Sequence, residues 1–437
     1  MDSVWMENVS LPRFEALRGN ADTDVLIIGG GITGLLCAYF LKEAGVDYIL
    51  AERTGICAGV TKNTTAKITS QHGLIYADLV RKQGIEKAAL YLEANQKALS
   101  MYRALSSEID CDFEEKSSYV YSLDDSRKLE EEVEALQRLH FPAELVQTEE
   151  LPFPTAGAVA FPEQAQFHPL KFLAGIAKDL NIYEHTFVKA LSEHEAVTAN
   201  GRIFFKRLIF ATHFPIDNKH GLYFLKMYQQ RSYCIALKNA AQIKGMYVDG
   251  SGKGLSFRNY GDFLLLGGGG HRTGKKGGNW QELRETAKKY YPEASEAYAW
   301  AAQDCMTLDG IPYIGKYSPA MPACFAATGY NKWGMTSAMT AAMLLADLIM
   351  EKENPFTAVF DPSRSMLKPQ LFYNAAEAAA GLLSLTTRRC PHLGCALKWN
   401  EAEHSWDCSC HGSRFDEEGA LLDNPANGDL RKEKAKR

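Results

Sequence analysis

Residues 23–53, TDVLIIGGGITGLLCAYFLKEAGVDYILAER, constrain the fold more than any other stretch of the chain. The run DVLII is continuously apolar, as expected of a strand buried on both faces. A glycine turn follows it, then a helical pattern that ends at Gly45, a residue suited to a helix C-terminus. DYILAE reads as a second strand. This order predicts a βαβ unit and therefore a parallel sheet.

Three glycines between the first strand and the helix, Gly29, Gly31 and Gly34, form the motif G-x-G-x-x-G. They permit a tight turn, close approach of the backbone to a pyrophosphate, and close packing of helix on strand. Glu52, followed by Arg53, ends the second strand, where an acid binds ribose hydroxyls and disfavours a 2′-phosphate. The pattern predicts a dinucleotide site, and by itself it suits either FAD or NAD.

The bulk properties fit an ordinary globular enzyme. The 437 residues suggest two to three domains, and a net charge of −5 with 23% charged residues does not call for nucleic acid. The N-terminus has no apolar stretch of signal-peptide length, and residues 336–350 are too short to span a bilayer. The basic ending, residues 431–437, reads as a frayed tail. We expect a cytoplasmic protein without nucleic-acid binding or membrane insertion.

Periodicity predicts most of the remaining elements. Apolar residues at helical spacing indicate two or three amphipathic helices between Tyr76 and His140, and another helix opens at Pro169. Two short strands, AVTA and GRIFF, precede a buried strand, RLIFATH. Alternating segments in residues 227–272 indicate an antiparallel sheet. A turn-rich hairpin, a strand and a helix over residues 335–350 follow.

Several of these segments together resemble the FAD-dependent amino-acid and amine oxidase superfamily, which holds D-amino-acid oxidase, glycine oxidase and sarcosine oxidase. The resemblance covers about residues 23–350 and rests on the glycine motif, RLIFATH, DGIPYIG and ATGYNKWGMTSAMTAAMLLADLI. It implies an α/β fold: a Rossmann-like FAD-binding domain with an α+β substrate domain built on an antiparallel sheet. It also favours FAD over NAD.

The resemblance further implies which residues contact FAD. In TKNTTAKITSQHG, the residues that wrap the pyrophosphate and flavin are Thr61, Thr64, Thr65 and Ala66. Ala211 and Thr212 of RLIFATH approach the ribityl–adenine region, and Val188 approaches the adenine. At the pyrimidine side of the isoalloxazine lie Gly329, Gly334, Met335 and Thr336.

Catalytic residues are less evident, because hydride transfer from a C–H bond beside nitrogen needs positioning more than a strong base. Relatives that bind carboxylates often carry an arginine shortly before the DG turn, whereas this chain reads AAQDCMTLDG. Arg258 is either the residue that replaces this carboxylate-binding arginine or an exposed arginine on a strand. His72 faces the flavin, or is a structural hydrogen-bonding residue. Lys332 stabilises the reduced flavin, or is a solvated lysine.

A Cys/His cluster near the C-terminus provides a second site. Cys390-x-His392 and Cys408-x-x-His411 are two short ligand pairs separated by fifteen residues. Mixed sulfur and nitrogen ligation suits tetrahedral zinc, or a [2Fe–2S] centre in which two histidines replace two cysteines on one iron. Chance clustering is the third alternative.

The loops CPHLGC and CSCHGSRF resemble the two cluster-binding loops of Rieske proteins. The resemblance implies that Cys395 and Cys410 form a disulfide, and that DNPANGDL, with Pro425 at its centre, covers the cluster. It spans only the cluster-binding part, because the segment before it, residues 370–389, reads as a helix and the chain ends soon after Leu430. We therefore expect a small, incomplete β-rich module.

These observations predict a discontinuous domain organisation: an FAD-binding domain of residues 1–75, 151–215 and 300–360, a substrate domain of residues 76–150 and 216–299, a linker helix of residues 361–385, and a Rieske-like module of residues 386–437.

The expected function is an FAD-dependent oxidoreductase that oxidises an amine or amino-acid-like C–N bond and passes electrons singly through the [2Fe–2S] centre to an unknown acceptor. One alternative is an electron-transfer component that serves a partner protein and has no small organic substrate. The other is an ordinary oxidase with a zinc-binding or metal-free remnant at its C-terminus.

Overall fold

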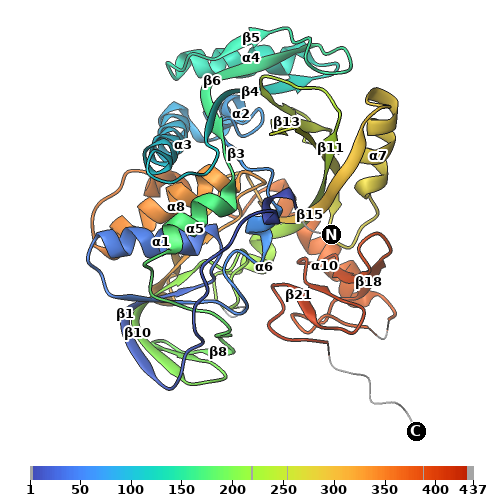
Figure 1. The fold of residues 1–437 in the computed structure, drawn as a ribbon. Coiled ribbons are helices and arrows are strands. Elements are labelled where there is room, and N and C mark those ends of the chain that lie inside the picture. The colour runs from blue at the N-terminus through green and yellow to red at the C-terminus, as the bar shows by residue number, and fades with distance from the viewer. Residues whose placement is uncertain (1–2, 218–219, 253, 387, 431–437) are drawn as a thin grey trace.

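The computed structural model describes residues 3–217, 220–252, 254–386 and 388–430, which fold around two large sheets and one small one (Figure 1). The first sheet has the strand order β16-β17-β10-β1-β2-β7, with β8 and β9 attached beside β10. Its strands are β1 (Ala21–Ile28), β2 (Tyr48–Ala51), β7 (Ile182–Tyr183), β8 (Ala190–Leu191), β9 (Glu195–Val197), β10 (Arg202–Phe210), β16 (Tyr313–Ser318) and β17 (Met321–Thr328).

Strand β1 is central in this sheet because it pairs in parallel with β10 on one side and β2 on the other. Val25 to Ile28 are buried, as the continuous apolar run requires. Helix α1 (Ile32–Glu43) connects β1 to β2. The predicted βαβ unit is therefore confirmed.

A layer of helices covers one face of the first sheet. Helix α1 packs against α8 (Gly334–Ile349) and α5 (Pro169–Ala177), and α8 also packs against α3 (Ile85–Ser106), an arrangement visible in Figure 1. Helix α8 is buried on almost every side. The helices predicted at Pro169 and at residues 335–350 are both present.

The second sheet is almost wholly antiparallel and has the strand order β15-β11-β14-β13-β12-β4-β6-β3, with β5 beside β6. The one parallel pair joins β12 to β4. Its strands are β3 (Lys67–Ile68), β4 (Glu114–Ser122), β5 (Glu144–Val146), β6 (Gly157–Gln166), β11 (Met227–Lys238), β12 (Met246–Asp249), β13 (Ser256–Tyr260), β14 (Phe263–Arg272) and β15 (Ser295–Thr307). The remaining helices here are α2 (Tyr76–Gln83), α4 (Ser126–Arg138), α6 (Tyr223–Lys226) and α7 (Asn279–Tyr290).

Two local predictions need correction. Residues 76–140 contain three helices, but strand β4 lies between α3 and α4 and pairs with β6. GRIFF and RLIFATH are not separate strands: residues 202–210 form the single strand β10, because β1 pairs with it from Ala21↔Ile203 to Ile28↔Phe210.

The two large sheets draw on interleaved parts of the chain. Strands β3, β6 and β15 pair in the second sheet, whereas α3 packs on α8 beside the first. The predicted domain boundaries place most residues of these strands with the FAD-binding part and α3 with the substrate part. The boundaries remain a proposal.

The C-terminal part begins with α9 (Thr357–Phe360) and the predicted linker helix, α10 (Pro369–Leu383). A four-stranded antiparallel sheet follows, with β18 (Leu397–Asn400), β19 (Ser405–Cys408), β20 (Arg414–Phe415) and β21 (Leu421–Asp423) in sequence order. The basic ending, residues 431–437, lies outside the described residues. Figure 1 shows this module beside β15 and α10.

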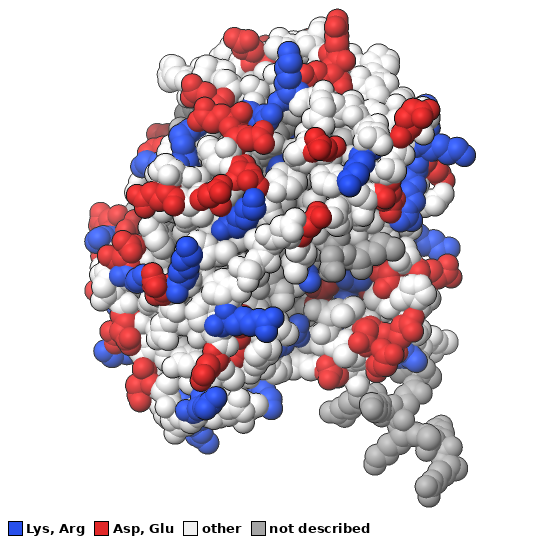
Figure 2. Space-filling model, viewed as in Figure 1, with Lys and Arg blue, Asp and Glu red and all other residues white. Residues whose placement is uncertain are grey.

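Across the described residues, no helix combines the length and the apolar character needed to cross a membrane. On the face drawn in Figure 2, lysines and arginines are interspersed with aspartates and glutamates, so no large field of one sign gathers there.

Candidate functional site

A cavity of about 1170 Å³ opens where the first sheet meets the second. Its lining includes the carboxyl ends of β1, β2 and β10 and one face of β11 and β15. In open α/β sheets, ligands bind at the carboxyl ends of the strands. The volume exceeds the roughly 300–1,000 Å³ of most small-molecule sites, which leaves room for a dinucleotide and a substrate together.

The glycine motif forms the floor of this cavity. Gly29 has a φ of +110°, and a Cβ there would lie 2.6 Å from the carbonyl oxygen of Ala211. A Cβ on Gly34 would lie 1.9 Å from the carbonyl oxygen of Gly29. Both positions thus require glycine, and helix α1 begins at Ile32 with its N-terminus toward the cavity, a ready site for a phosphate.

Most residues implied for FAD binding line this one cavity, although they come from six separate parts of the chain. They are Gly29, Gly31, Glu52, Arg53, Thr61, Thr64, Thr65, Val188, Ala211, Thr212, Gly329, Gly334 and Met335, and the candidate catalytic residues His72 and Lys332 line it too. The cradle around the glycines and the room in the cavity both fit FAD. Glu52 already accepts a hydrogen bond from the Gly30 amide at 2.7 Å.

Three implied FAD contacts, Gly34, Ala66 and Thr336, do not line the cavity. Gly34 packs on the turn, as its lack of space shows. Ala66 is fully buried, and its carbonyl oxygen accepts a hydrogen bond from Arg258. Thr336 is buried as well and donates to the carbonyl oxygen of Thr69. These residues support the cavity wall from behind.

His72 lines the cavity, yet both its ring nitrogens are engaged. Nδ1 lies 2.6 Å from the Tyr91 hydroxyl and Nε2 lies 2.9 Å from the Thr69 carbonyl oxygen. The imidazole also stacks on Trp333, with ring centroids 5.1 Å apart. Burial lowers the pKa of His72 to about 3, so the ring is neutral. This geometry suits a residue that positions the turn before α8.

Arg258 requires a correction, because it is neither an exposed strand arginine nor a cavity residue. Its side chain is fully buried behind the cavity wall. Nη1 donates to the carbonyl oxygens of Thr65 and Ala66, each at 2.8 Å, and the guanidinium lies over the Trp5 ring. Arg258 therefore cannot meet a substrate carboxylate in this arrangement.

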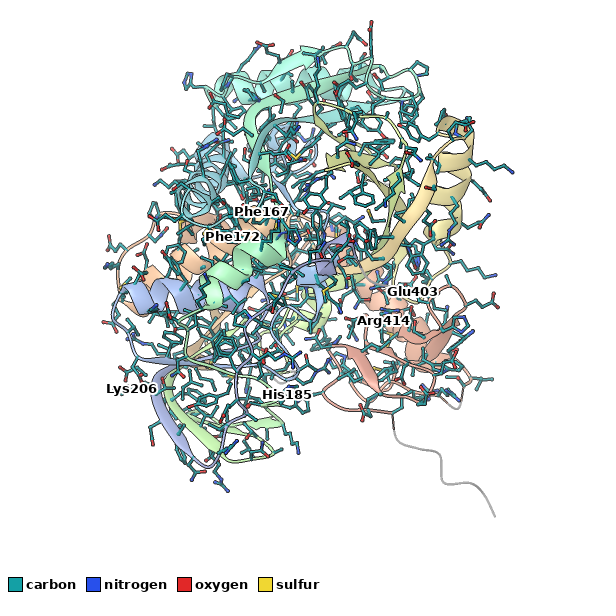
Figure 3. All side chains as sticks on the ribbon, in the orientation of Figure 1. Phe167, Phe172, His185, Lys206, Glu403 and Arg414 are labelled. Atoms are coloured by element: carbon teal, nitrogen blue, oxygen red, sulfur yellow. A yellow bond between two sulfur atoms is a disulfide. The ribbon has the colours of Figure 1, made fainter. Side chains whose placement is uncertain are left out.

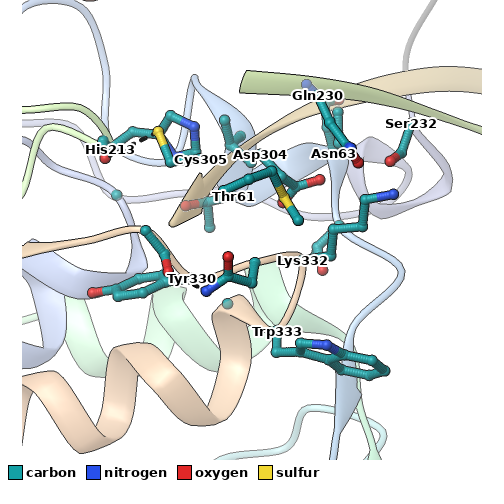
Figure 4. A pocket seen from close by; sticks show the side chains of 18 of the residues that line it. Thr61, Asn63, His213, Gln230, Ser232, Asp304, Cys305, Tyr330, Lys332 and Trp333 are labelled. Atoms are coloured by element: carbon teal, nitrogen blue, oxygen red, sulfur yellow. Dashed lines mark hydrogen bonds between the residues drawn. The ribbon is translucent and has the colours of Figure 1, made fainter. Parts of the chain in front are cut away.

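Four polar side chains that sequence reasoning did not select as ligands face the same cavity: Gln230 and Ser232 from β11, Asp304 from β15, and His213 (Figure 4). Ser232 Oγ and His213 Nε2 are buried without a hydrogen-bond partner among the described residues. Alternation along β11 is the signal that could have identified Gln230 and Ser232.

Asp304 and Lys332 both lie in the cavity, and their opposite charges attract each other (Figure 4). Burial raises the pKa of Asp304, and Lys332 partly offsets that rise. Burial lowers the pKa of Lys332, and Asp304 partly offsets that fall. Lys332 is therefore not a solvated lysine. Its backbone has a φ of +74°, a conformation that costs energy for a residue with a Cβ and that often marks functional sites.

The second site is built from two loops with the same local geometry. The Gly394 amide donates to the Cys390 carbonyl oxygen and the Gly412 amide to the Cys408 carbonyl oxygen, each at 2.9 Å. Both glycines have positive φ, 80° and 90°. The loops bring the rings of His392 and His411 to 4.9 Å between centroids. The two imidazoles therefore lie side by side, and the thiols of Cys390 and Cys408 are within hydrogen-bonding distance of each other.

The chemistry of these four side chains fits metal ligation. The hydrogen bond between the two thiols lowers the pKa of Cys408 and raises that of Cys390, and backbone amides of residues 410–412 further favour the Cys408 thiolate. Burial lowers the pKa values of His392 and His411, to about 4 and 3, and keeps both rings neutral. His411 Nδ1 is buried without a partner among the described residues. Cys395 and Cys410 form the expected disulfide.

A buried ionic network attaches this module to the second sheet. Glu403 binds Arg231 of β11, with 2.9 Å from Arg231 Nε to Oε1, and also binds Arg414, which reaches Asp407 and Asp423 (Figure 3). Burial by itself would raise the pKa of Glu403, but the two guanidiniums lower it to about 2. No local sequence signal pairs these residues, since Arg231 and Glu403 are far apart in the chain.

Comparison with known proteins agrees with both sites. Residues 24–348 match the family described as FAD dependent oxidoreductase, and residues 368–433 match the Rieske [2Fe-2S] domain. A Bacillus subtilis (strain 168) protein, provisionally named Rieske 2Fe-2S iron-sulfur protein YhfW, is 34% identical over 97% of this chain and 96% of its own length.

Two solved structures share the fold of the larger part. Glycine oxidase from Geobacillus kaustophilus matches 79% of this chain and 100% of its own, with a TM-score of 0.66 at 18% identity. L-proline dehydrogenase from P. horikoshii matches 80% and 98%, with a TM-score of 0.67 at 17% identity. The chain belongs to the FAD-dependent oxidoreductase family, carries a C-terminal Rieske domain, and has FAD and a [2Fe–2S] cluster as its cofactors.

Proposed function

We propose that this enzyme oxidises an amine or amino-acid-like C–N bond at FAD and passes the electrons one at a time to its own Rieske cluster. The observation that carries the proposal is that one sheet separates the two sites. On β11 and β15, Gln230, Ser232 and Asp304 line the FAD cavity. Their neighbours on the opposite face bind the cluster module, as described next. Residues that alternate along a strand point to opposite faces, so the wall is one sheet thick.

The contacts on the far face involve the ligand loops directly. Gln229 Nε2 donates to the His411 carbonyl oxygen at 2.9 Å and to the Asn424 carbonyl oxygen at 3.0 Å. Gln303 Nε2 donates to the Gly412 carbonyl oxygen at 2.8 Å. These bonds fix the second ligand loop against the cavity wall, a supporting interaction of the kind that metal ligands need.

A second connection runs through the loop that contains Pro425. Asp423, Asn424 and Ala426 line the FAD cavity itself. Asn424 Nδ2 donates to the carbonyl oxygens of Thr212 and Phe214, at 2.6 and 2.7 Å. The Phe214 ring in turn lies 6.4 Å from the His392 ring. This short, bonded route between the sites supports electron transfer within one chain.

When bound, FAD supplies a two-electron acceptor for hydride and can give up electrons singly. The residues of this chain bind and orient. The α8 N-terminus and Lys332 would supply positive charge to the pyrimidine side of a bound flavin, where reduction concentrates negative charge. His72 and Trp333 hold the turn that carries Lys332.

The cavity favours a substrate with a cationic nitrogen. Asp304 offers a carboxylate that makes no ion pair of 4 Å or less among the described residues, and Arg53 is the single arginine among the lining residues described. Glycine oxidase and L-proline dehydrogenase, which share the fold, are named for substrates with such a nitrogen. The free, buried state of cysteines 37, 57, 111, 234, 305 and 324 supports a reducing, cytoplasmic location.

Anaerobic mixing of the protein with a panel of amines and amino acids tests the proposal. We expect the oxidised-flavin absorbance to bleach first and a Rieske-type EPR signal to appear second, in the same sample. Bleaching by a reduced partner protein alone would favour the electron-transfer component. Iron-free protein that binds zinc at Cys390 and Cys408 would contradict the electron path.

A further inference from the structure

Lys67 is a buried lysine with no acidic partner. It opens β3 within the segment implied to wrap the flavin, residues 61–73, and its side chain lines the FAD cavity while 9% of the residue remains exposed. Its Nζ donates to the Thr65 hydroxyl at 3.5 Å. Among the ion pairs of the described residues, none includes Lys67. Buried ammonium groups are normally paired, so this one needs an explanation.

Arg258 lies directly behind Lys67 and cannot move away. Besides the two bonds to Thr65 and Ala66, its Nε donates to the Asn259 carbonyl oxygen at 3.2 Å, and the guanidinium rests over Trp5. Nη2 has no partner among the described residues. An arginine stays charged in proteins, so a fixed positive charge sits beside the lysine.

The titratable groups around Lys67 come from three strands. Arg258 of β13 and the Cys234 thiol of β11 act on Lys67, and Glu114 of β4 acts on Arg258 while paired to Lys116 at 3.1 Å. Burial lowers the pKa of Lys67, Arg258 adds to the fall, Cys234 opposes it, and the result is about 7. A lysine beside a second cation is an established way to obtain a neutral amine at physiological pH.

Oxidation of a C–N bond gives such an amine a task. An ammonium nitrogen has no lone pair, so the substrate must lose an N–H proton before the neighbouring C–H can leave as hydride. The other cavity candidates are less suited to accept that proton. Both His72 nitrogens are engaged, Asp304 faces Lys332, and burial lowers the pKa of His213, which makes that imidazole a weaker base.

We propose that Lys67 is the base that takes the proton from the substrate nitrogen, and that Arg258 is a positioning residue that keeps Lys67 neutral. The inference rests on the proposed C–N oxidation. The N–H bond breaks, its electron pair stays on nitrogen, and the proton becomes the third N–H of Lys67. The C–H bond then breaks, hydride goes to FAD, and the nitrogen pair forms C=N. Lys67 returns its proton to solvent.

Competitive acetylation measures the protonation of Lys67 without any turnover. The FAD-loaded protein is treated with trace acetic anhydride between pH 5 and 11, and the peptide that contains Lys67 is quantified by mass spectrometry, with the exposed lysines of the same sample as the internal scale. We expect half-maximal reactivity near pH 7 for Lys67. A midpoint near that of the exposed lysines, or protection at every pH, would overturn the proposal.

Two variants test the role of Arg258. Arg258→Met should raise the Lys67 midpoint by one pH unit or more, and Arg258→Lys should restore most of the shift. His213→Asn, a change to another polar cavity residue, is the matched control and should leave the midpoint in place. If Arg258→Met does not fold, the wild-type midpoint still decides whether Lys67 is neutral.

A kinetic measurement keeps this inference separate from the proposed function. With an amine that bleaches the flavin, Lys67→Met should slow flavin reduction by at least tenfold and abolish the acid limb near pH 7 in the pH profile of that rate. Lys67→Arg should not restore the rate. If no amine bleaches the flavin but the midpoint lies near 7, the proposed substrate fails while the neutral lysine stands. An unchanged pH profile in Lys67→Met would refute the base.

Discussion

At the residue scale, a buried lysine without an acidic partner makes the stability of the protein depend on pH. Lys67 binds its proton less tightly in the folded state, with a pKa of about 7 against 10.5 unfolded, so the unfolded state holds more protons between these values. Stability must therefore rise with pH across that window, by up to about 1.4 kcal/mol per pH unit. Relative to Lys67→Met, the wild type should gain stability from pH 7 to 10, as measured by denaturant unfolding of FAD-loaded protein.

The exposed Lys316, replaced by Met, is the control for that series, because its side chain faces solvent in β16. The difference in the free energy of unfolding between Lys316→Met and the wild type should stay constant over the same pH range. If the difference in the free energy of unfolding between Lys67→Met and the wild type is also independent of pH, the Lys67 amine has an ordinary pKa in the folded protein.

The third glycine of the motif is a residue-scale test of the cofactor site. A methyl group at Gly34 would lie 1.9 Å from the Gly29 carbonyl oxygen, so helix α1 must shift away from the turn. Overpacking of this kind costs about 1–3 kcal/mol. We expect Gly34→Ala to be purified with less than a tenth of the wild-type flavin content. Gly428→Ala adds its methyl group to open space and should retain full flavin content.

At the scale of elements, strands β11 and β15 serve two sites at once. One face supplies the cavity with Gln230 and Asp304, and the other supplies the module with Gln229 and Gln303. An ordinary antiparallel sheet with one wet face would carry exposed polar residues on that side. Here Gln229 and Gln303 are buried and hydrogen-bonded to the module. The second sheet thus supports a module that has only four short strands of its own.

The Glu403 network makes this docking measurable. Glu403→Ala leaves Arg231 and Arg414 buried without their shared carboxylate, and breaking a buried pair costs about 3–5 kcal/mol. We expect residues 388–430 to lose hydrogen-exchange protection while α1 and α8 keep theirs. Glu417→Ala, which removes an exposed pair with His404, should have almost no effect.

The Glu403 carboxyl also predicts a low pH at which the C-terminal module detaches from the second sheet. Its pKa is lowered from 4.5 to about 2, so its contribution is complete above pH 4.5 and is lost as the pH falls toward 2. Protection of residues 388–430 should therefore decline in that window in the wild type. Persistence of full protection at pH 2 would contradict a role for the ionised Glu403.

Sequence reasoning located the elements whose signals are local. The glycine turn, α5, α8 and α10 follow from periodicity and end residues, and the ligand loops follow from Cys/His spacing. It missed β4, because EEKSSYVYS opens with charged residues that are exposed at the start of the strand. It interpreted Arg258 as either a substrate-binding or an exposed arginine, whereas its burial depends on the backbone carbonyls of residues 65 and 66. Non-local bonds of this kind, like that of Arg231 to Glu403, have no local sequence signature.

At the scale of the whole molecule, the two cofactor sites are connected but depend on different residues. None of the four cluster ligands lines the FAD cavity. Its lining comes mainly from residues 28–334, and residues 368–369, 421–424 and 426–427 of the C-terminal part complete it. Loss of the cluster should therefore leave FAD in place and interrupt only the onward transfer of electrons. The alternative, an oxidase that does not use its C-terminal module, predicts no change in turnover.

Cys408→Ser separates these cases. Cys408 is buried between the amides of its loop and the disulfide, and serine cannot supply a thiolate there. Iron should fall from roughly two per chain to background, since the cluster holds two irons, while the flavin content is unchanged. Anaerobic bleaching by an active amine should keep its rate, and turnover with a one-electron acceptor should fall roughly tenfold or more. Cys111→Ser, which alters a free, buried thiol that neither lines the FAD cavity nor belongs to the cluster loops, is the control. Normal one-electron turnover in the iron-free variant would show that electrons leave the flavin by another route.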